Sequence, residues 1–398
     1  MNPDLDRLKP YPFERLAALK ADLKPATGKE HISLAIGEPQ HQTPHFIGEA
    51  LIAHSHGVNR YAPTAGSREL RETFCRWLTD RFKLPAERLD PDRHVLPVAG
   101  TREGLFAIAQ AVVDRTADPV VVMPNPFYQI YEGAALLSGA EPYYLDTARA
   151  NGYQPDFDRV PESVWRRCQL VYICSPGNPS GAVIPVDRLR RLVELAERHD
   201  FVIACDECYS EIYLDEQAPP PGLLQACAEA GHDDFSRCLV FHSLSKRSSA
   251  PGLRSGFVAG DAEILRRFLV YRTYQGCAMP LQTQAASIAA WSDETHVRSN
   301  RKAYRTKLQA ALNILGPALS IQAPEAGFYL WAPTPIDDQD FTRRLYEQQN
   351  VTVLPGSYLS RATADGDPGA GHVRIALVAE AEACAEAVWR IRYFVENL

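Results

Sequence analysis

The chain has 398 residues, of which 45% are hydrophobic and 23% are charged, values typical of a folded globular protein with two or three domains. Its formal net charge of −7 argues against a nucleic-acid-binding protein, which needs a concentrated basic surface. No apolar run approaches the ~18 residues that span a bilayer, and the N-terminus lacks a signal peptide, so we expect a cytoplasmic enzyme without membrane partners.

Residues 1–30 show no sustained hydrophobic period, and we expect an N-terminal arm with a short helix there. Residues 1–45 together are expected to form this arm and part of a smaller domain. From residue 46 to residue 282, short apolar segments alternate with helical ones. The predicted strands are residues 94–98, 120–123, 170–174, 201–205 and 238–242, and the predicted helices include residues 69–82, 105–113 and 186–199. Apolar strands separated by helices favour a mostly parallel sheet covered by helices on both faces, the core of a large α/β domain.

Residues 283–398 have a different character. A charged helical stretch over residues 283–315 precedes strand-like pieces at residues 327–331 and 372–377, and a helix is predicted over residues 380–395. This order indicates a second, smaller α+β domain.

Chemically useful residues stand directly after the predicted strands. Gly100 and Thr101 follow one strand, Asn178 follows another, Asp206 a third and Lys246 a fourth. Because ligands of parallel sheets bind beyond the carboxyl ends of the strands, these residues are expected to share one site.

The segment from Ser243 to Arg254 is the most informative in the chain. Lys246 follows an apolar run, Ser243 and Ser245 precede it, and a Pro-Gly pair stands before Arg254. Lysine forms Schiff bases with carbonyl cofactors such as pyridoxal 5'-phosphate (PLP), and serine hydroxyls with a guanidinium suit its phosphate. The plainer interpretation of this segment is a strand followed by a polar loop.

Other residues extend this interpretation. A carboxylate at Asp206 would favour the protonated pyridine nitrogen of such a cofactor, whereas an aspartate after a strand is otherwise a cap or turn residue. Tyr209 and Asn178 could donate hydrogen bonds to the phenolate oxygen, although a packing tyrosine and a Pro/Gly/Asn turn explain them equally well. Tyr128 could stack on the ring, and Arg374, in an apolar strand, could face a substrate carboxylate or form an internal salt bridge.

The segment Gly100-Thr101-Arg102 opens a predicted helix, and free N–H groups at a helix start attract phosphate. The nine cysteines and eleven histidines show no metal-ligand spacing, and Cys205-Asp-Glu-Cys208 is interpreted as structural. We therefore predict no metal site.

Taken together, these residues resemble the fold-type I, PLP-dependent aminotransferases of class I/II, over essentially the whole chain. The matching motifs are Gly37-Glu-Pro39, Tyr61-x4-Gly66, Gly100-Thr101, Asn178-Pro-x-Gly181, Asp206-x-x-Tyr209, Ser243-x-Ser-Lys246, Pro251-Gly-x-Arg254, Gly327-Phe-Tyr and Arg374.

The resemblance implies a large PLP-binding domain and a small domain, with the roles proposed above. It further implies that Arg374 binds the α-carboxylate of the substrate, with Gly37 and Asn178 beside it. Tyr61 resembles a tyrosine that reaches the phosphate of the neighbouring subunit, which implies a homodimer with shared active sites. The substrates would be an amino acid and a 2-oxo acid.

Residues 8–16, 37–44 and 245–260 resemble, more narrowly, the succinyldiaminopimelate aminotransferases of lysine and diaminopimelate biosynthesis. The alternatives are an aminotransferase of the aspartate, aromatic or alanine type, a PLP-dependent β-lyase, or a non-catalytic ligand-binding protein on the same fold. Arg102 and Arg247 are candidates for contact with the distal part of the substrate, and the plainer interpretation of each is a solvated surface charge.

Overall fold

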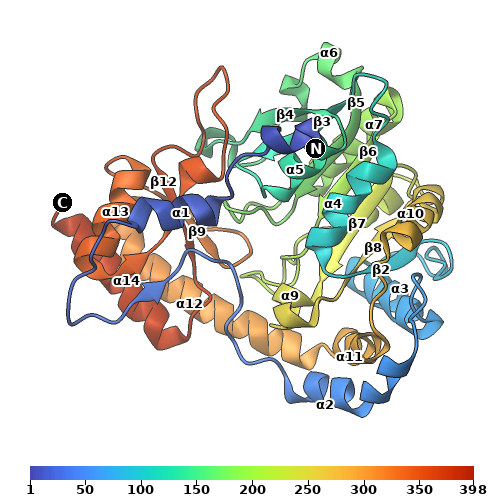
Figure 1. Ribbon diagram of the computed structural model, residues 1–398, viewed down its shortest axis with the longest axis horizontal. Coiled ribbons are helices and arrows are strands. Elements are labelled where there is room, and N and C mark those ends of the chain that lie inside the picture. The colour runs from blue at the N-terminus through green and yellow to red at the C-terminus, as the bar shows by residue number, and fades with distance from the viewer.

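A computed structural model describes all residues from 1 to 398, and Figure 1 shows two bodies side by side. The larger contains a seven-stranded sheet in the order β2-β8-β7-β6-β5-β3-β4. Its strands are β2 (Val95–Val98), β3 (Val120–Asn125), β4 (Glu141–Asp146), β5 (Cys168–Cys174), β6 (Val202–Asp206), β7 (Cys238–Ser243) and β8 (Gly256–Gly260). All strands run parallel except β8, which is antiparallel to both of its neighbours.

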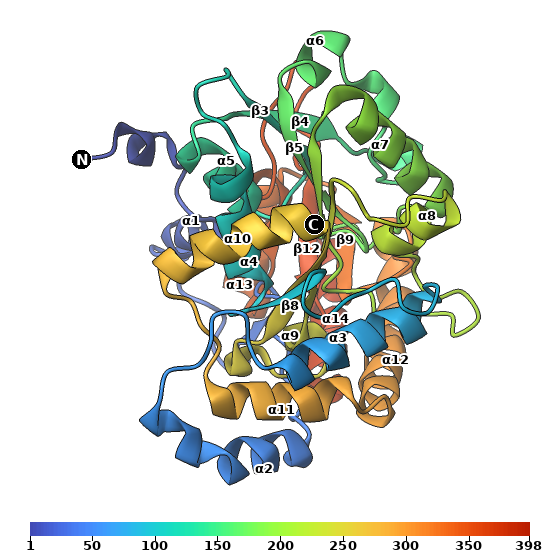
Figure 2. The ribbon, with the colours of Figure 1, turned by 90° about the vertical axis from the view of Figure 1, so that its right-hand side faces the viewer.

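Helices cover both faces of this sheet, as Figure 2 shows. One face packs against α3 (Arg68–Phe82), α7 (Val186–His199), α8 (Leu223–Glu229) and α11 (Leu281–Trp291), and the other against α4 (Thr101–Val112), α5 (Ile130–Leu137) and α10 (Ala262–Gln275). Each face buries its own apolar cluster, of 42 and 21 residues. Burial on both faces explains why these strands are nearly continuous apolar runs.

Helix α7 illustrates how the sequence specifies these elements. Leu189, Leu192 and Val193 recur at helical spacing and are buried against the sheet. The helix ends where Asp200 adopts the left-handed conformation, with φ of 58°. A short polar residue tolerates this conformation better than most, so the chain turns there into β6.

The smaller body has its own core and joins distant parts of the sequence. A three-stranded antiparallel sheet contains β9 (Tyr329–Pro333), β11 (Leu354–Pro355) and β12 (His372–Ala376). The strand β1 (Ile32–Ser33) pairs in parallel with β10 (Val351–Thr352), so the N-terminal segment joins the C-terminal part of the chain. The helices of this body are α12 (Thr295–Leu319), α13 (Asp338–Gln349) and α14 (Ala381–Glu396).

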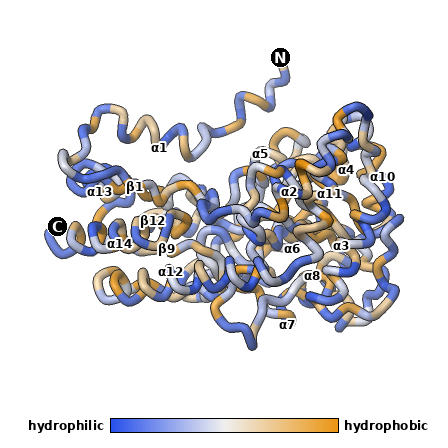
Figure 3. Tube along the Cα trace, turned by 90° about the horizontal axis from the view of Figure 1, so that it is seen from below, coloured by the Kyte–Doolittle hydropathy of each residue, from blue (hydrophilic) through white to orange (hydrophobic).

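The remaining helices belong to the N-terminal segment. Figure 3 shows α1 (Pro12–Lys20) and the residues before it along one side of the molecule. Helix α2 (His45–Ala53) packs against α11, at the far end of the large body in Figure 1. No helix is long and apolar enough to cross a membrane.

Most elements follow the predicted order, with three differences. The predicted helix 283–315 is two helices, α11 and α12, separated by residues 292–294. Some elements had no sequence prediction, among them the strands β4 and β8 and the helices α2, α5, α8, α10 and α13. Because α11 packs with α2 and α3, we propose that the division between the large and small domains falls at residues 292–294 instead of residue 282.

Candidate active site

A cleft of about 540 Å³ opens at the carboxyl edge of the large sheet, where the small body meets it. The loops after β2, β5, β6 and β7 converge on it, as expected from the strand order. Twelve of the predicted residues line it: Gly37, Thr101, Arg102, Tyr128, Asn178, Asp206, Tyr209, Ser243, Ser245, Lys246, Arg254 and Arg374.

Lys246 lies on the floor of the cleft, on the one-turn helix α9 (Leu244–Arg247) that follows β7. Its Nζ donates to the backbone carbonyl of Gly37 and lies 5.6 Å from the ring centre of Phe328. Burial lowers the pKa of this amine to about 8. Much more of Lys246 is therefore neutral near physiological pH than of an ordinary lysine, and the neutral amine is the form that acts as a nucleophile or a proton acceptor.

Asp206, at the end of β6, is buried on the same cleft. Its Oδ2 accepts a hydrogen bond of 2.9 Å from the hydroxyl of Tyr131, and its Oδ1 accepts one of 3.3 Å from the amide of Cys208. Burial raises the pKa of this carboxyl, and hydrogen bonds from the Cys208 thiol, the Tyr131 hydroxyl and the Cys208 amide act in the opposite direction. The sequence prediction found Asp206 but gave no role to Tyr131, which lies eight residues beyond the end of the predicted strand 120–123.

One end of the cleft collects groups that suit a phosphate. Gly100 precedes α4 with φ of 83°, and a Cβ at this position would lie 2.4 Å from Nη2 of Arg254. The site therefore requires glycine there. The guanidinium of Arg254 donates only to the carbonyls of Pro251 and Ala99, and the hydroxyls of Ser243 and Ser245 lie 3.0 Å apart. A guanidinium without an acidic partner, next to a helix start, can bind an anion.

Arg374, on β12, forms a second cationic position in the cleft. Its Nη1 donates to Oδ1 of Asn178 at 3.0 Å and its Nη2 to the carbonyl of Ala35 at 2.7 Å. Its buried Nε has no hydrogen-bond partner. A buried guanidinium with an unused donor and no acidic partner is suited to a carboxylate ligand.

Tyr329 connects this position to the floor of the cleft, and the sequence prediction noted it only as part of a motif. Its hydroxyl lies 3.0 Å from that of Tyr209, and its ring stacks under the guanidinium of Arg374, 4.5 Å from ring centre to Cζ. A Cβ on Gly37 would lie 1.9 Å from the Tyr329 hydroxyl. Gly37 is thus required by close approach of the two segments.

Arg102 and Tyr128 lie at the mouth of the cleft, where Nε of Arg102 donates to the Tyr128 hydroxyl at 2.7 Å. The Tyr11 hydroxyl is 3.4 Å from Nη2 of the same arginine. Tyr61 lies outside the cleft, with its side chain fully exposed. Its predicted contact with a neighbouring subunit stays a prediction.

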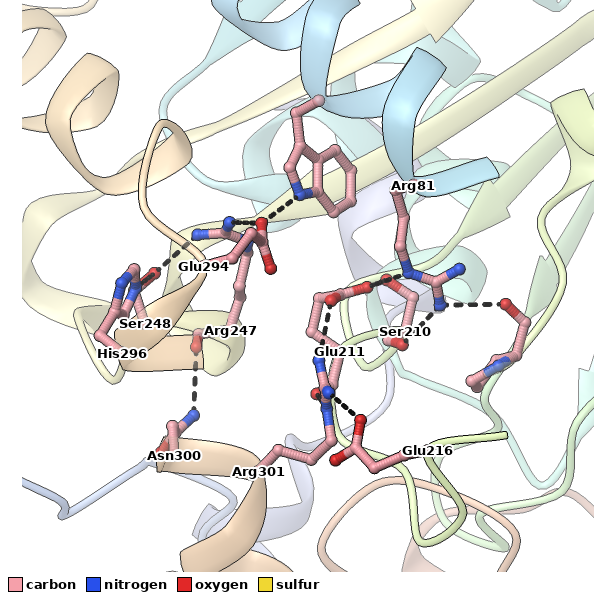
Figure 4. Close-up of polar contacts among 12 residues, drawn as sticks. Arg81, Ser210, Glu211, Glu216, Arg247, Ser248, Glu294, His296, Asn300 and Arg301 are labelled. Atoms are coloured by element: carbon pink, nitrogen blue, oxygen red, sulfur yellow. Dashed lines mark hydrogen bonds and ion pairs between the residues drawn. The ribbon is translucent and has the colours of Figure 1, made fainter. Parts of the chain in front are cut away.

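The expectation for Arg247 was wrong, because this residue is buried and paired beneath the lysine turn. Figure 4 shows its guanidinium bonded to Glu294, and it also donates to the carbonyl of Ala290 at 2.8 Å. Asn300 donates to the carbonyls of both Lys246 and Arg247, at 3.0 and 3.1 Å. Arg247 therefore supports the turn that carries Lys246 and does not reach the cleft. The sequence alone could not show this, because it does not reveal which side chains of a turn face the interior.

The residues present fit PLP. An amine of lowered pKa, a buried carboxylate, and a guanidinium beside a glycine cradle line one cleft, and these groups match an aldehyde, a ring nitrogen and a phosphate respectively. Arg374, with its unused Nε, provides for one more anionic group.

The chain is similar to known proteins over nearly its whole length. The family model for aminotransferase class I and II matches residues 29–391. An LL-diaminopimelate aminotransferase of Dehalococcoides mccartyi is 31% identical over 399 residues, covering 98% of this chain and 97% of that protein. The crystal structure of an aminotransferase from Neisseria meningitidis is 46% identical, with a TM-score of 0.95, over 99% of this chain and 100% of that one.

A second solved structure, the aminotransferase AspB from Helicobacter pylori, is 38% identical with a TM-score of 0.91, over 98% of this chain and 100% of that one. These matches confirm the predicted family, fold class and cofactor. The chain belongs to the class I and II aminotransferases, a family of PLP-dependent enzymes that act on amino acids and 2-oxo acids.

Proposed function

We propose that Lys246 is the catalytic base of an aminotransferase and the residue that carries its cofactor. When bound, PLP supplies an aldehyde that takes up the amino group and a ring that accepts electron density from the α-carbon. The Nζ of Lys246 holds and moves the α-proton of the substrate, and its lowered pKa supports this role. The single observation that carries the proposal is that this amine lies in one cleft with a buried carboxylate and two guanidiniums without acidic partners.

The other residues receive roles from their positions in the cleft. Asp206 would face the ring nitrogen of the cofactor, and Asn178 and Tyr209 would donate to its phenolate oxygen. Ser243, Ser245, Arg254 and the segment Gly100-Thr101-Arg102, where α4 begins, would hold the phosphate. Tyr128 would pack on the ring, and Arg374 would bind the α-carboxylate of the substrate with Gly37 and Asn178 beside it.

For the substrate we propose N-succinyl-LL-2,6-diaminopimelate, with 2-oxoglutarate as the amino acceptor. The distal end of this molecule carries carboxylates and no ammonium group. Arg102, at the mouth of the cleft, contacts only tyrosine hydroxyls and has no acidic partner, which supports an anionic distal group.

A second candidate, LL-diaminopimelate itself, is favoured by the name of the relative in Dehalococcoides mccartyi. The distal end of this molecule carries an ammonium group as well as a carboxylate. Glu38 lines the same cleft and supplies a carboxylate that an ammonium group would require.

Two matched variants separate these substrates. If the succinylated compound is the substrate, Arg102→Gln raises its KM by about tenfold, since a hydrogen bond to a charged group is lost, and Glu38→Gln has little effect. If LL-diaminopimelate is the substrate, Glu38→Gln is the damaging change. Turnover of both compounds with 2-oxoglutarate is measured for each variant.

The same assay tests the more distant alternatives. Aspartate, an aromatic amino acid and alanine are tried as donors with 2-oxoglutarate, and release of ammonia is followed to detect a β-lyase. Preference for any of these donors over both diaminopimelates would overturn the proposed substrate.

We also propose a homodimer in which Tyr61 completes the site of the partner subunit. The full exposure of Tyr61 in one chain supports this assignment. Subunits carrying Lys246→Ala and subunits carrying Tyr61→Ala are mixed after gentle dissociation. If each active site uses residues of both subunits, the mixture regains activity that neither variant has alone. If the protein is shown to be a dimer and the mixture stays inactive, the proposal of shared sites is contradicted.

A further inference from the structure

A hydroxyl beneath the cleft contacts the carboxylate of Asp206. Tyr131, in the first turn of α5, is fully buried, and its hydroxyl lies 2.9 Å from Oδ2 of Asp206. Cys208 also contacts this carboxylate, through its backbone amide at 3.3 Å and through its thiol, which is a weak donor. No lysine, arginine or histidine forms an ion pair with Asp206, so the Tyr131 hydroxyl is the strongest side-chain donor that reaches it.

The hydroxyl of Tyr131 is held as a donor. Burial and the nearby charge of Asp206 both raise the pKa of Tyr131 well above its ordinary value, so the hydroxyl keeps its proton. An ionised carboxylate only accepts hydrogen bonds, and the proton therefore points to Asp206. Burial raises the pKa of Asp206 and favours its neutral form, and the bond from Tyr131 is one of the contacts that oppose this effect.

Neighbouring aromatic rings fix the position of Tyr131. Its ring stacks on that of Tyr172 with 4.7 Å between centres and 9° between planes, and it meets Tyr128 edge-on at 5.7 Å. Tyr172 is fully buried as well, but its hydroxyl donates to the carbonyl of Leu105 at 2.6 Å. The two stacked tyrosines thus have the same surroundings and different hydrogen-bond partners.

We propose that Tyr131 is a positioning residue that keeps Asp206 ionised and directed at the ring nitrogen of the cofactor. The inference rests on the role proposed above for Asp206. The neutral hydroxyl of Tyr131 stabilises the buried negative charge of Asp206. That charge in turn stabilises the protonated ring nitrogen of the cofactor.

The test compares PLP with its analogue in which a CH group replaces the ring nitrogen. Binding of each to the cofactor-free protein is measured by quenching of tryptophan fluorescence. Tyr131→Phe is expected to weaken PLP binding by about tenfold and to leave binding of the analogue unchanged, because only PLP has a nitrogen for Asp206 to contact. Tyr172→Phe, the matched control, is expected to bind both compounds as the unmodified protein does.

A second measurement reads the nitrogen directly. With ¹⁵N-labelled PLP bound, the chemical shift of the ring nitrogen is expected to move toward the unprotonated value in Tyr131→Phe and to stay unchanged in Tyr172→Phe. Equal weakening of both compounds by Tyr131→Phe, or an unchanged nitrogen shift, would overturn the proposal.

Asp206→Asn shows which assignment has failed. If this variant discriminates between the two compounds and Tyr131→Phe does not, the role of Asp206 stands and that of Tyr131 falls. If neither variant discriminates, the role of Asp206 falls, and that of Tyr131 with it. No amino acid is used, so the identity of the substrate does not affect the result.

Discussion

The cleft and the network beneath the lysine turn both contain buried cations, but only the network pairs them with acids. Glu211 accepts from Nε of Arg81 at 2.7 Å and from Nη2 of Arg301 at 3.3 Å, and Glu294 pairs with Arg247 (Figure 4). In the cleft, Lys246 donates to a carbonyl, and Arg254 and Arg374 contact carbonyls and one amide oxygen.

This difference separates structural from ligand-binding cations. A buried charge needs a counter-ion, and an arginine paired within the chain already has one. Lys246, Arg374 and the more exposed Arg254 lack such partners, which supports the proposal that the phosphate of the cofactor and the carboxylate of the substrate supply their counter-ions. The comparison predicts that changes in the cleft impair activity while changes in the network impair stability.

The largest expected effect is that of Lys246→Ala. Transamination is expected to fall by at least about 10³-fold, because the amine that moves the proton is lost, and the visible absorbance of the bound cofactor should disappear. Stability of the cofactor-free protein, measured by urea unfolding, should not fall. Near-normal turnover in this variant would refute the assignment of Lys246.

Glu211→Gln provides the opposite case. Burial raises the pKa of Glu211, but the charges of Arg81, Arg247 and Arg301 outweigh it and leave the pKa below its ordinary value. Removing this charge leaves the guanidinium of Arg81 without an acidic partner, while Arg301 keeps Glu216, and is expected to lower the free energy of unfolding by about 3 kcal/mol.

The matched control for that variant is Glu263→Gln. Glu263 also binds two arginines, Arg266 and Arg267, but on the exposed surface of α10. Solvent screens such pairs, so its effect on urea unfolding should be far smaller. If Glu211→Gln and Glu263→Gln destabilise the protein equally, the proposed difference between buried and exposed ion pairs is contradicted.

Arg374→Gln tests the second cation of the cleft. Loss of a hydrogen bond to a charged group is worth about 1.5–3 kcal/mol, so KM for both the amino acid and the 2-oxo acid should rise about tenfold to a hundredfold. A primary amine without an α-carboxylate serves as the control substrate, and its slow reaction should be unchanged. Equal loss with the amine would show that Arg374 supports the cleft and does not bind the carboxylate.

The smallest effect concerns pH. Since the pKa of Lys246 is lowered to about 8, the amine is protonated below this pH and neutral above it. The rate at which the cofactor-free protein captures PLP should therefore rise up to about pH 8 and then level off, as followed by stopped-flow absorbance. Nα-acetyl-lysine, whose side-chain amine has an ordinary pKa, serves as the reference compound. The rate of its reaction with PLP should keep rising beyond pH 9.

The same shift has a consequence for stability. A lysine whose pKa is lower in the folded state binds fewer protons there than in the unfolded chain. The cofactor-free protein should therefore gain stability as the pH rises from about 8 toward 10.5, relative to Lys246→Met. If the rate at which the cofactor-free protein captures PLP keeps rising beyond pH 9, the lowered pKa of Lys246 is contradicted.

Part of the site could be predicted because its residues follow strands. Apolar runs such as residues 170–174 and 238–242 identify buried parallel strands, and ligand-binding residues of such sheets follow the carboxyl ends. This reasoning located Asn178, Asp206 and Lys246. It did not reveal β8, which contains two glycines in five residues and runs antiparallel between two parallel neighbours.

Other residues depended on contacts that no local pattern records. Arg247 and Arg254 look alike in the sequence, yet one is buried against Glu294 and the other lines the cleft. Tyr131 resembles any aromatic residue of a buried helix until its hydroxyl is seen beside Asp206. In each case the partner lies more than 40 residues away.

The amino-acid sequence alone determined the family and the cofactor, because the motifs that resemble the family are local properties of the chain, and it indicated Lys246 as the residue for which we propose the chemistry. Only the tertiary structure decided which cations are paired and which are not. Pairing depends on distances between distant segments, and these distances distinguish an arginine that stabilises the fold from one that awaits a ligand.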